Sequence, residues 1–224
     1  MARPGLTLHN TFPTLLPTKY VITIGRSFGS GGRELGRLIA SRLGIAFYDK
    51  MLLVKAAEKA GYNIDYFEQA DERVPKIMGG IIPFSMGFYP GSWIGDSAAG
   101  TDMVYKAQCE FIRELAAGEP CVIVGRSADY VLRDVPNVVN IFVHAPIEHC
   151  VERIMRRGDC SDAGQAKSLA ERTNKLRANF YNFYTDRRWG RADSYHLCID
   201  SSTLPMESLV DLVIDYIHRR LDQA

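Results

Sequence analysis

Residues 20–35 read Tyr20-Val-Ile-Thr-Ile-Gly-Arg-Ser-Phe-Gly-Ser-Gly-Gly-Arg-Glu-Leu35. The first five residues form an apolar run typical of a buried strand, and the residues after Gly32 begin a helical pattern that continues through Leu35, Leu38 and Ile39. Glycines between a strand and a helix let successive backbone N–H groups converge on an anion, and the helix start adds positive partial charge. The stretch therefore predicts a strand, a phosphate-binding loop and a helix.

The loop departs from the consensus phosphate-binding loop, G-x-x-x-x-G-K-[ST]. In the gapless register that keeps the flanking strand and helix in step, Gly32 stands where lysine belongs, and neither Arg33 nor Glu34 after it carries a hydroxyl. Moving the register by one residue places Arg33 on the lysine position and Glu34 on the hydroxyl position. The usual hydroxyl ligand of Mg2+ is therefore missing. Glu34 either binds the metal weakly through water or repels nucleotide unless Arg26 or Arg33 neutralises it.

Length and composition indicate one soluble α/β domain. The chain has 224 residues, of which 46% are hydrophobic and 24% charged, and its net charge is +1. That balance gives no global field that favours nucleic acid or a membrane as partner. The five cysteines form no C-x-x-C pair, which suits a reducing cytoplasm, and the histidines show no metal-binding spacing. No apolar run approaches the length that spans a membrane.

Strand-like and helix-like segments alternate along the chain. The strands are expected at 20–24, 45–49, 121–125, 138–145 and 195–200. The helices are expected at 33–43, 51–60, 103–117, from Pro146, at 162–183 and from Pro205. This alternation predicts a three-layer fold with a parallel five-stranded sheet and helices on both faces, in which ligands bind at the carboxyl ends of the strands. Residues 1–18 are expected to be a flexible arm and not a signal peptide, and residues 19–224 a single domain with an insert at about 62–102.

The segment 79–100 breaks the alternation. Its glycines and prolines argue against a long helix, and its aromatic residues argue against plain disorder. We expect a mobile cover over an acceptor pocket, on whose aromatic side chains a base could stack. These side chains are Phe84, Phe88, Tyr89 and Trp93. The alternative is a packed loop or a partner-docking surface.

Arginines in the second half of the chain suggest phosphate chemistry. Guanidinium groups bind phosphate oxygens bidentately, and a mobile arginine helix can exclude water from the transferred group. The best candidates are Arg153, Arg172 and Arg177, and Arg126 directly follows the strand expected at 121–125. The chain has no convincing nucleophile–histidine–carboxylate set, which is compatible with phosphoryl transfer to a phosphate, because that acceptor is already ionised. A hydroxyl acceptor would need a base, for which Asp49 and Asp129 are candidates.

Taken in order, several stretches resemble the cytidylate kinase-like family, relatives of bacterial cytidylate kinase among the nucleoside monophosphate kinases. The matching stretches are Val21–Glu34, Ala46–Lys50, Cys121–Leu132, Ile141–Pro146 and Cys198–Thr203. They extend over nearly all of the chain after residue 19. Bacterial cytidylate kinases differ from this chain in having the loop lysine, an arginine where Cys150 stands, and acidic residues where Ser127 and Asn174 stand.

The resemblance implies a P-loop kinase fold that uses ATP and Mg2+ to phosphorylate a small nucleotide, CMP or dCMP first, with no nucleic acid or membrane as partner. It implies that the ATP phosphates lie on Gly29, Ser30, Gly31, Gly32, Arg33 and Glu34. It implies an acceptor site with Asp49, Arg126 and Asp129, and a lid at about 153–180. It also implies that Arg126 holds phosphate, that Arg153 reaches in from the lid helix, and that Arg172 and Arg177 line the transferred group. Arg33 is expected to replace the missing lysine in part. Two alternatives stay open: a non-catalytic nucleotide- or phosphate-binding protein, and a kinase for another small metabolite.

Overall fold

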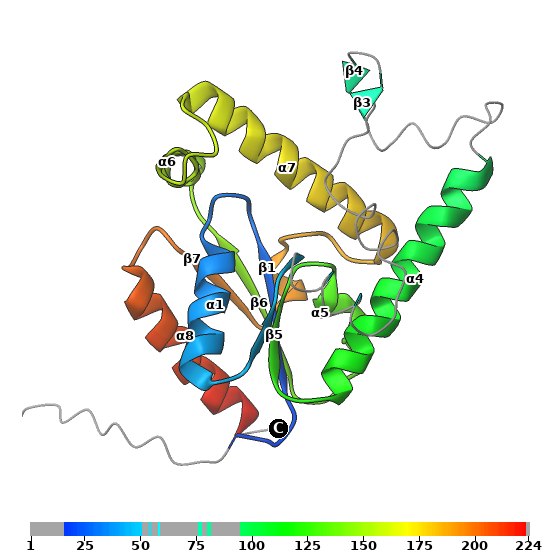
Figure 1. Cartoon of the computed structure of the whole chain (residues 1–224). Helices are drawn as coiled ribbons and strands as arrows, with labels where there is room; N and C mark the ends of the chain where they lie inside the picture. Colours follow the sequence, from blue (N-terminus) through cyan, green and yellow to red (C-terminus); the bar gives the residue numbers. More distant parts are fainter. Residues whose placement is uncertain are drawn as a thin grey trace, which may run out of the picture.

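In the described part of the chain, five parallel strands form one sheet in the order β2-β5-β1-β6-β7 (Figure 1). The computed structural model describes residues 16–50, 54, 58, 76–77, 80–81 and 95–222, with backbone alone at 76–77, 80–81 and 95–104. The strands are β1 (Val21–Arg26), β2 (Ala46–Tyr48), β5 (Cys121–Val124), β6 (Val138–His144) and β7 (Leu197–Asp200). A separate antiparallel pair consists of β3 (Lys76–Ile77) and β4 (Gly80–Ile81).

Helices cover both faces of the five-stranded sheet. Helices α1 (Gly32–Leu43) and α8 (Met206–Leu221) lie on one face, and α4 (Gly95–Ala117) and the short α5 (Ala128–Val131) lie on the other (Figure 1). Helices α6 (Ile147–Arg156) and α7 (Ala163–Tyr184) pack on each other beyond the carboxyl ends of the strands. A 3-10 turn, η2 (Ala192–Ser194), precedes β7. This is the three-layer α/β fold that the sequence predicts.

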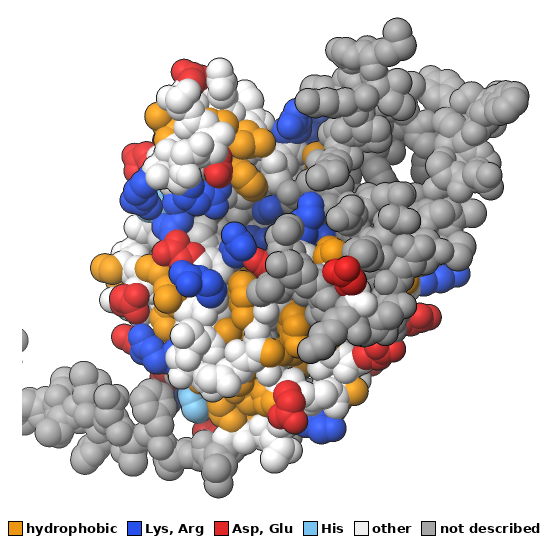
Figure 2. All heavy atoms as spheres, in the orientation of Figure 1, with side chains coloured by type: hydrophobic (Ala, Val, Ile, Leu, Met, Phe, Trp, Pro, Cys, Tyr) orange, Lys and Arg blue, Asp and Glu red, His pale blue; other side chains and the backbone are white. Residues whose placement is uncertain are grey.

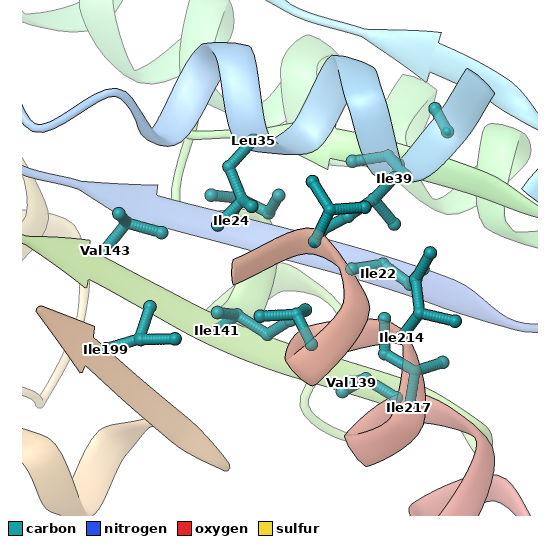
Figure 3. Close-up of a cluster of buried hydrophobic side chains, with 14 of the residues drawn as sticks. Ile22, Ile24, Leu35, Ile39, Val139, Ile141, Val143, Ile199, Ile214 and Ile217 are labelled. Carbon is teal, nitrogen blue, oxygen red and sulfur yellow. The ribbon is translucent and has the colours of Figure 1, made fainter. Parts of the chain in front are cut away.

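The alternation of side chains along β1 divides the core between the two faces. Ile22 and Ile24 are fully buried among α1 and α8 residues, whereas Val21 packs in the cluster on the opposite face. Figure 3 shows Ile22 and Ile24 between α1 and the residues of α8. A β-carbon added to Gly36 would lie 2.8 Å from Ile24 Cδ1, so the glycine lets α1 approach the sheet closely. The close packing therefore holds α1 against β1, with the loop between them.

The structure confirms the predicted strands to within a few residues and corrects two boundaries. Helix α4 begins at Gly95 and not at residue 103, so the expectation that glycines and prolines exclude a helix is wrong for residues 95–100. The prolines of that segment all lie before Gly95, so no proline interrupts the helix. The last strand begins at Leu197 and not at residue 195, because η2 ends immediately before Tyr195.

Some predictions fall on residues that the structure does not describe. Of the expected helix 51–60, only Val54 and Glu58 are described, and both are helical. The four aromatic residues of the expected cover over the acceptor pocket also lie outside the described residues. At the other end, Leu16 packs against the core, so the packed domain includes part of the segment that the sequence assigned to the arm.

Candidate phosphate-binding site

The chain between β1 and α1 has the backbone geometry of an anion-binding loop. Gly29 and Gly31 have φ values of 82° and 83°, a left-handed conformation that favours glycine. Gly31 is the N-cap of α1, so the N–H groups of Gly32, Arg33 and Glu34 have no acceptor within the helix. Such N–H groups at a helix start bind phosphate oxygens in many proteins. The glycines that the sequence singled out therefore give the loop its left-handed turns.

Buried hydroxyl groups fix the loop to the ends of β6 and β7. The Ser30 side chain is fully buried, with its Oγ 2.9 Å from the Ser27 carbonyl oxygen and 3.0 Å from that of Val143. The Ser27 N–H donates to Val143 O over 2.9 Å, and Ser201 Oγ donates to Ser30 O over 2.5 Å. Because these bonds lie within the protein, the loop has its shape before any ligand binds. Ser30 therefore offers a phosphate its backbone and not its hydroxyl.

Helix α6 lies directly against the loop. A β-carbon added to Gly29 would lie 2.8 Å from the carbonyl oxygen and 2.9 Å from the Cβ of Cys150. Cys150 is buried, and burial raises the pKa of its thiol. The residue that departs from the bacterial cytidylate kinases thus fills the contact between α6 and the loop.

Helix α7 holds the same loop from the other side. Asn174 Oδ1 accepts the Phe28 N–H over 2.7 Å, and Arg177 Nη1 donates to the Arg26 carbonyl oxygen over 3.1 Å. The Arg177 guanidinium also lies 5.5 Å from the centre of the Phe28 ring, as does that of Arg157. Arg177 therefore lies at the loop, where it binds backbone, and its expected contact with the transferred group stays a prediction.

Arg153 reaches the start of α1 from α6. Its guanidinium forms an ion pair with Glu34, and a β-carbon added to Gly31 would lie 2.7 Å from the Arg153 Cζ. Arg153 is buried, whereas the Glu34 side chain is 49% exposed. The structure thus brings together a cation that the resemblance implies and the carboxylate of Glu34.

Arg33 points toward the end of β2. Its Nε and Nη2 each lie 2.6 Å from Asp49 Oδ2. The Asp49 side chain is 6% exposed and that of Arg33 is 69% exposed. Two residues that the sequence proposed for different roles therefore form one ion pair beside the loop.

The turn after β5 places Arg126 at the same edge of the sheet. Gly125, Arg126 and Ser127 have φ values of 81°, 60° and 52°, so three successive residues are left-handed. Non-glycine residues in this conformation cost free energy and cluster at functional sites. The turn ends as Ser127 caps α5. Arg126 thus occupies the carboxyl edge of the sheet, as predicted, in a strained backbone conformation.

Asp129 lies in the interior and joins α5 to α7. Its Oδ2 accepts the Tyr181 hydroxyl over 2.6 Å, and both side chains are buried. Burial raises the pKa of the Asp129 carboxyl, and burial together with the Asp129 charge raises the pKa of Tyr181. The structure gives Asp129, which the resemblance assigns to the acceptor site, an anchoring contact. Sequence reasoning did not identify Tyr181.

The remaining predictions concern Arg172 and the metal. Arg172 is exposed on α7. The described residues contain no group of three or more His, Cys, Asp or Glu that could hold a metal ion. Glu34 fits a water-mediated Mg2+ contact by its place in the first turn of α1, although Arg153 is its partner here. Figure 2 shows Lys and Arg side chains gathered below the α6–α7 pair, in the region of this site. No helix in the described ranges is long and apolar enough to cross a membrane.

Comparisons with known proteins agree with the fold. The profile described as cytidylate kinase-like family matches residues 21–203. The crystal structure of an uncharacterized protein from Eubacterium ventriosum ATCC 27560 has a TM-score of 0.66 and 26% identity, covering 89% of this chain and 98% of that chain. A gluconokinase from Sinorhizobium meliloti 1021 has a TM-score of 0.52 and 15% identity, covering 92% and 95%.

Of two further matches, one bears on the fold alone and the other covers only part of the chain. Shikimate kinase from Acinetobacter baumannii, in complex with shikimate, has a TM-score of 0.51 and 14% identity, covering 91% of this chain and 95% of that one. This likeness and that to the gluconokinase show the kinase fold alone. A uronate isomerase from Corynebacterium glutamicum is 30% identical over 105 residues. That match takes in 47% of this chain, which spans about a fifth (20%) of the length of this curated relative.

Proposed function

The chain belongs to the cytidylate kinase-like family, and on this premise we propose that it transfers a phosphoryl group from ATP to a nucleoside monophosphate, CMP or dCMP first. The observation that carries the proposal is the rigid loop Ser27–Gly32, whose glycine conformations and inward hydroxyl groups leave the N–H groups of the α1 start for a phosphate. The surrounding cations are Arg26 at the end of β1, Arg33 in α1, Arg126 in the turn after β5, Arg153 in α6 and Arg177 in α7.

In this mechanism the protein positions two phosphates and stabilises the charge between them. The N–H groups of residues 31–34 bind the donor phosphates, and Arg153 exchanges Glu34 for a phosphate oxygen. Arg126 and the Arg33–Asp49 pair face the acceptor. The acceptor phosphate is ionised at neutral pH, so no general base is needed. Mg2+, when bound, neutralises charge on the phosphate oxygens, and Glu34 would hold it through water.

The α6–α7 pair is proposed as the lid at about 153–180. It has a small core of its own, formed by Ile154, Ala166 and Ala170, with Phe28 of the loop packed against it. Because Arg153 lies in α6 and Arg177 in α7, a shift of the pair on nucleotide binding would move both arginines relative to the loop. Arg172, exposed on the same helix, would then approach the transferred group.

A specific observation favours each alternative function. The ion pair between Glu34 and Arg153 occupies the hydroxyl position of the shifted register, which favours a non-catalytic nucleotide-binding protein. The buried carboxyl of Asp49, held by Arg33, offers a base for a hydroxyl acceptor, which favours a kinase for another small metabolite. The five free thiols support a cytoplasmic location under any of these functions.

A coupled ADP-release assay tests the proposal. ATP and Mg2+ are supplied with CMP, dCMP, UMP, AMP or GMP, and with shikimate and gluconate as hydroxyl acceptors. We expect acceptor-dependent ADP release with CMP or dCMP. Release with a hydroxyl compound alone would instead support the metabolite kinase, and ATP binding without turnover on any acceptor would support the non-catalytic protein.

Glu34→Gln separates the roles of the carboxylate. If Glu34 holds Mg2+, the variant has lower activity and requires more Mg2+ for half-maximal rate. If Glu34 only repels phosphate, the variant binds nucleotide more tightly, because Arg153 loses its competing partner. A Mg2+ titration of the initial rate, with ATP affinity measured by calorimetry, distinguishes these results; tighter binding with no turnover in either form would contradict the catalytic proposal.

A further inference from the structure

The side chain of Arg26, the last residue of β1, begins beside the position where the consensus loop has its lysine. A β-carbon added to Gly32 would lie 2.6 Å from the Arg26 Cβ and 3.3 Å from its Cγ. The Val143 Cβ would lie 3.1 Å from the same added atom. The space that a lysine stem would enter at position 32 is thus already taken by the stem of Arg26.

From Gly32 the Arg26 side chain extends across the end of β5. A β-carbon added to Gly125 would lie 2.9 Å from the Arg26 Cζ and closer still to its Nη1. Gly125 has a φ of 81° and begins the strained turn that carries Arg126. Gly32, in α1, and Gly125, just after β5, therefore leave a path for one arginine, and its guanidinium reaches Gly125. Arg26 remains partly exposed along this path.

Compared with the consensus loop, this chain has exchanged the residue types at two positions. In G-x-x-x-x-G-K the first glycine stands six residues before the lysine. With Gly32 at the lysine position, that first glycine position is Arg26. The chain thus has an arginine where the consensus has glycine, and a glycine where the consensus has lysine.

We propose that Arg26 supplies the phosphate-binding cation of this loop in place of the missing lysine. The inference rests on the proposed function, since it assigns a residue to the donor-phosphate site. A guanidinium presents a planar fork that binds two phosphate oxygens, whereas an ammonium acts as a point charge. Two nearby cations are held in ion pairs in this structure: Arg33 is paired with Asp49, and Arg153 with Glu34. Arg177 meanwhile holds the Arg26 carbonyl, which fixes the backbone from which the side chain starts.

Four variants test the exchange. The control is Arg37→Ala, because Arg37 is exposed on α1, one turn after Arg33. They are Arg26→Ala, Arg26→Lys, Gly32→Lys and the double variant Arg26→Gly with Gly32→Lys. ATP affinity is measured by calorimetry, kcat and KM by ADP release, and folding by circular dichroism. Removal of one well-placed cation from a phosphoryl-transfer site costs a factor of about 100 or more in rate.

We expect Arg26→Ala to weaken ATP binding at least about tenfold and to lower kcat by about that factor of 100. Arg26→Lys should recover part of both losses. Gly32→Lys alone should impair the protein, because its Cβ collides with Arg26. The double variant should regain ATP affinity to within about tenfold of the wild type, since it restores the consensus pair.

ATP affinity and kcat of Arg26→Ala equal to those of Arg37→Ala would overturn the inference while leaving the proposed function intact. A wild-type protein that binds no ATP would overturn the proposed function, and this inference with it. If Arg26→Ala does not fold, the double variant carries the test: recovered ATP binding supports the exchange, and a folded double variant without ATP affinity contradicts it.

Discussion

The loop Ser27–Gly32 and the arginines around it are held in place by different means. The loop is fixed by glycine conformations, by the buried Ser30 hydroxyl and by the Ser201 bond to Ser30. Two of the arginines, Arg33 and Arg153, are instead held by the charged partners Asp49 and Glu34. The backbone half of the site is preformed, whereas the cationic half must exchange partners when a phosphate binds.

This difference predicts how the two halves respond to substitution. A change in the loop alters packing against buried atoms, so it should lower the free energy of unfolding as well as ligand affinity. A change in an arginine removes a charge that is at least partly replaceable by water, so it should lower affinity or rate with little effect on stability. The predictions below run from the largest expected effect on stability to the smallest.

Gly29→Ala should have the largest effect. The new β-carbon would meet the Cys150 carbonyl oxygen at 2.8 Å, in a left-handed conformation that disfavours alanine. We expect a loss of about 3 kcal/mol or more in the free energy of unfolding, from backbone strain and overpacking together. Gly44→Ala is the matched control, because Gly44 is also left-handed (φ 66°) but has no atom within 4 Å of an added β-carbon.

For Gly44→Ala we expect only the conformational cost of about 1–2 kcal/mol. Urea denaturation of both variants and the wild type measures the two losses. Equal losses would show that Gly29 is required for its backbone angle alone, and that the loop is not closely packed on α6.

Asp129→Asn should have an intermediate effect that depends on pH. Burial raises the pKa of Asp129 above its ordinary value of 3.8. For a carboxyl raised on folding, its stabilisation is full below the unfolded pKa and is lost as pH rises through the folded pKa. The wild type should therefore lose stability relative to the variant as pH rises from 3.5 to 8. The asparagine keeps an acceptor for the Tyr181 hydroxyl, so the α5–α7 contact survives.

The measurement is the difference in unfolding free energy between the variant and the wild type across that pH range. Asp134→Asn serves as control, because the Asp134 side chain is 85% exposed. A difference that stays constant with pH would contradict the raised pKa. If Asp129 only anchors α7, the variant also retains its affinities for ATP and for the acceptor. A large loss of acceptor affinity would instead show that Asp129 belongs to the acceptor site.

Arg33→Ala should have the smallest effect on stability. The Arg33 side chain is 69% exposed, and exposed ion pairs contribute about 1 kcal/mol or less. We expect the KM of the monophosphate acceptor to rise about fivefold, the equivalent of that free energy, because Asp49 loses its ion pair with Arg33. Steady-state kinetics of Arg33→Ala and Arg37→Ala check this. Equal KM values in the two variants would show that the Arg33–Asp49 pair does not serve the acceptor.

The sequence alone predicts the sheet, the helices and the phosphate-binding loop, because each depends on local patterns. Apolar runs such as Cys121–Val124 are buried strands, and glycines at 29 and 31 mark left-handed turns. The helix from Gly95 was missed because the glycine- and proline-rich residues before it dominated the interpretation of the whole segment.

The side-chain partners are less predictable, because they depend on distances between elements far apart in the chain. Nothing near Glu34 indicates that Arg153, 119 residues later, forms an ion pair with it. The bond from Tyr181 to Asp129 spans 52 residues and is likewise invisible locally. Ser201 did fall within a stretch that resembles the family, but its role as the donor to Ser30 requires the fold.

The most direct test of a preformed phosphate site is thermal unfolding with ATP and Mg2+ compared with adenosine and Mg2+. A ligand at ten times its Kd stabilises the folded protein by about 1.4 kcal/mol, which raises Tm by about 3–6 °C in a domain of this size. If Ser27–Gly32 binds phosphate, millimolar ATP raises Tm by that amount, and adenosine, which lacks phosphates, does not. No shift with ATP, or an equal shift with adenosine, would contradict the assignment of Ser27–Gly32 as the phosphate-binding loop.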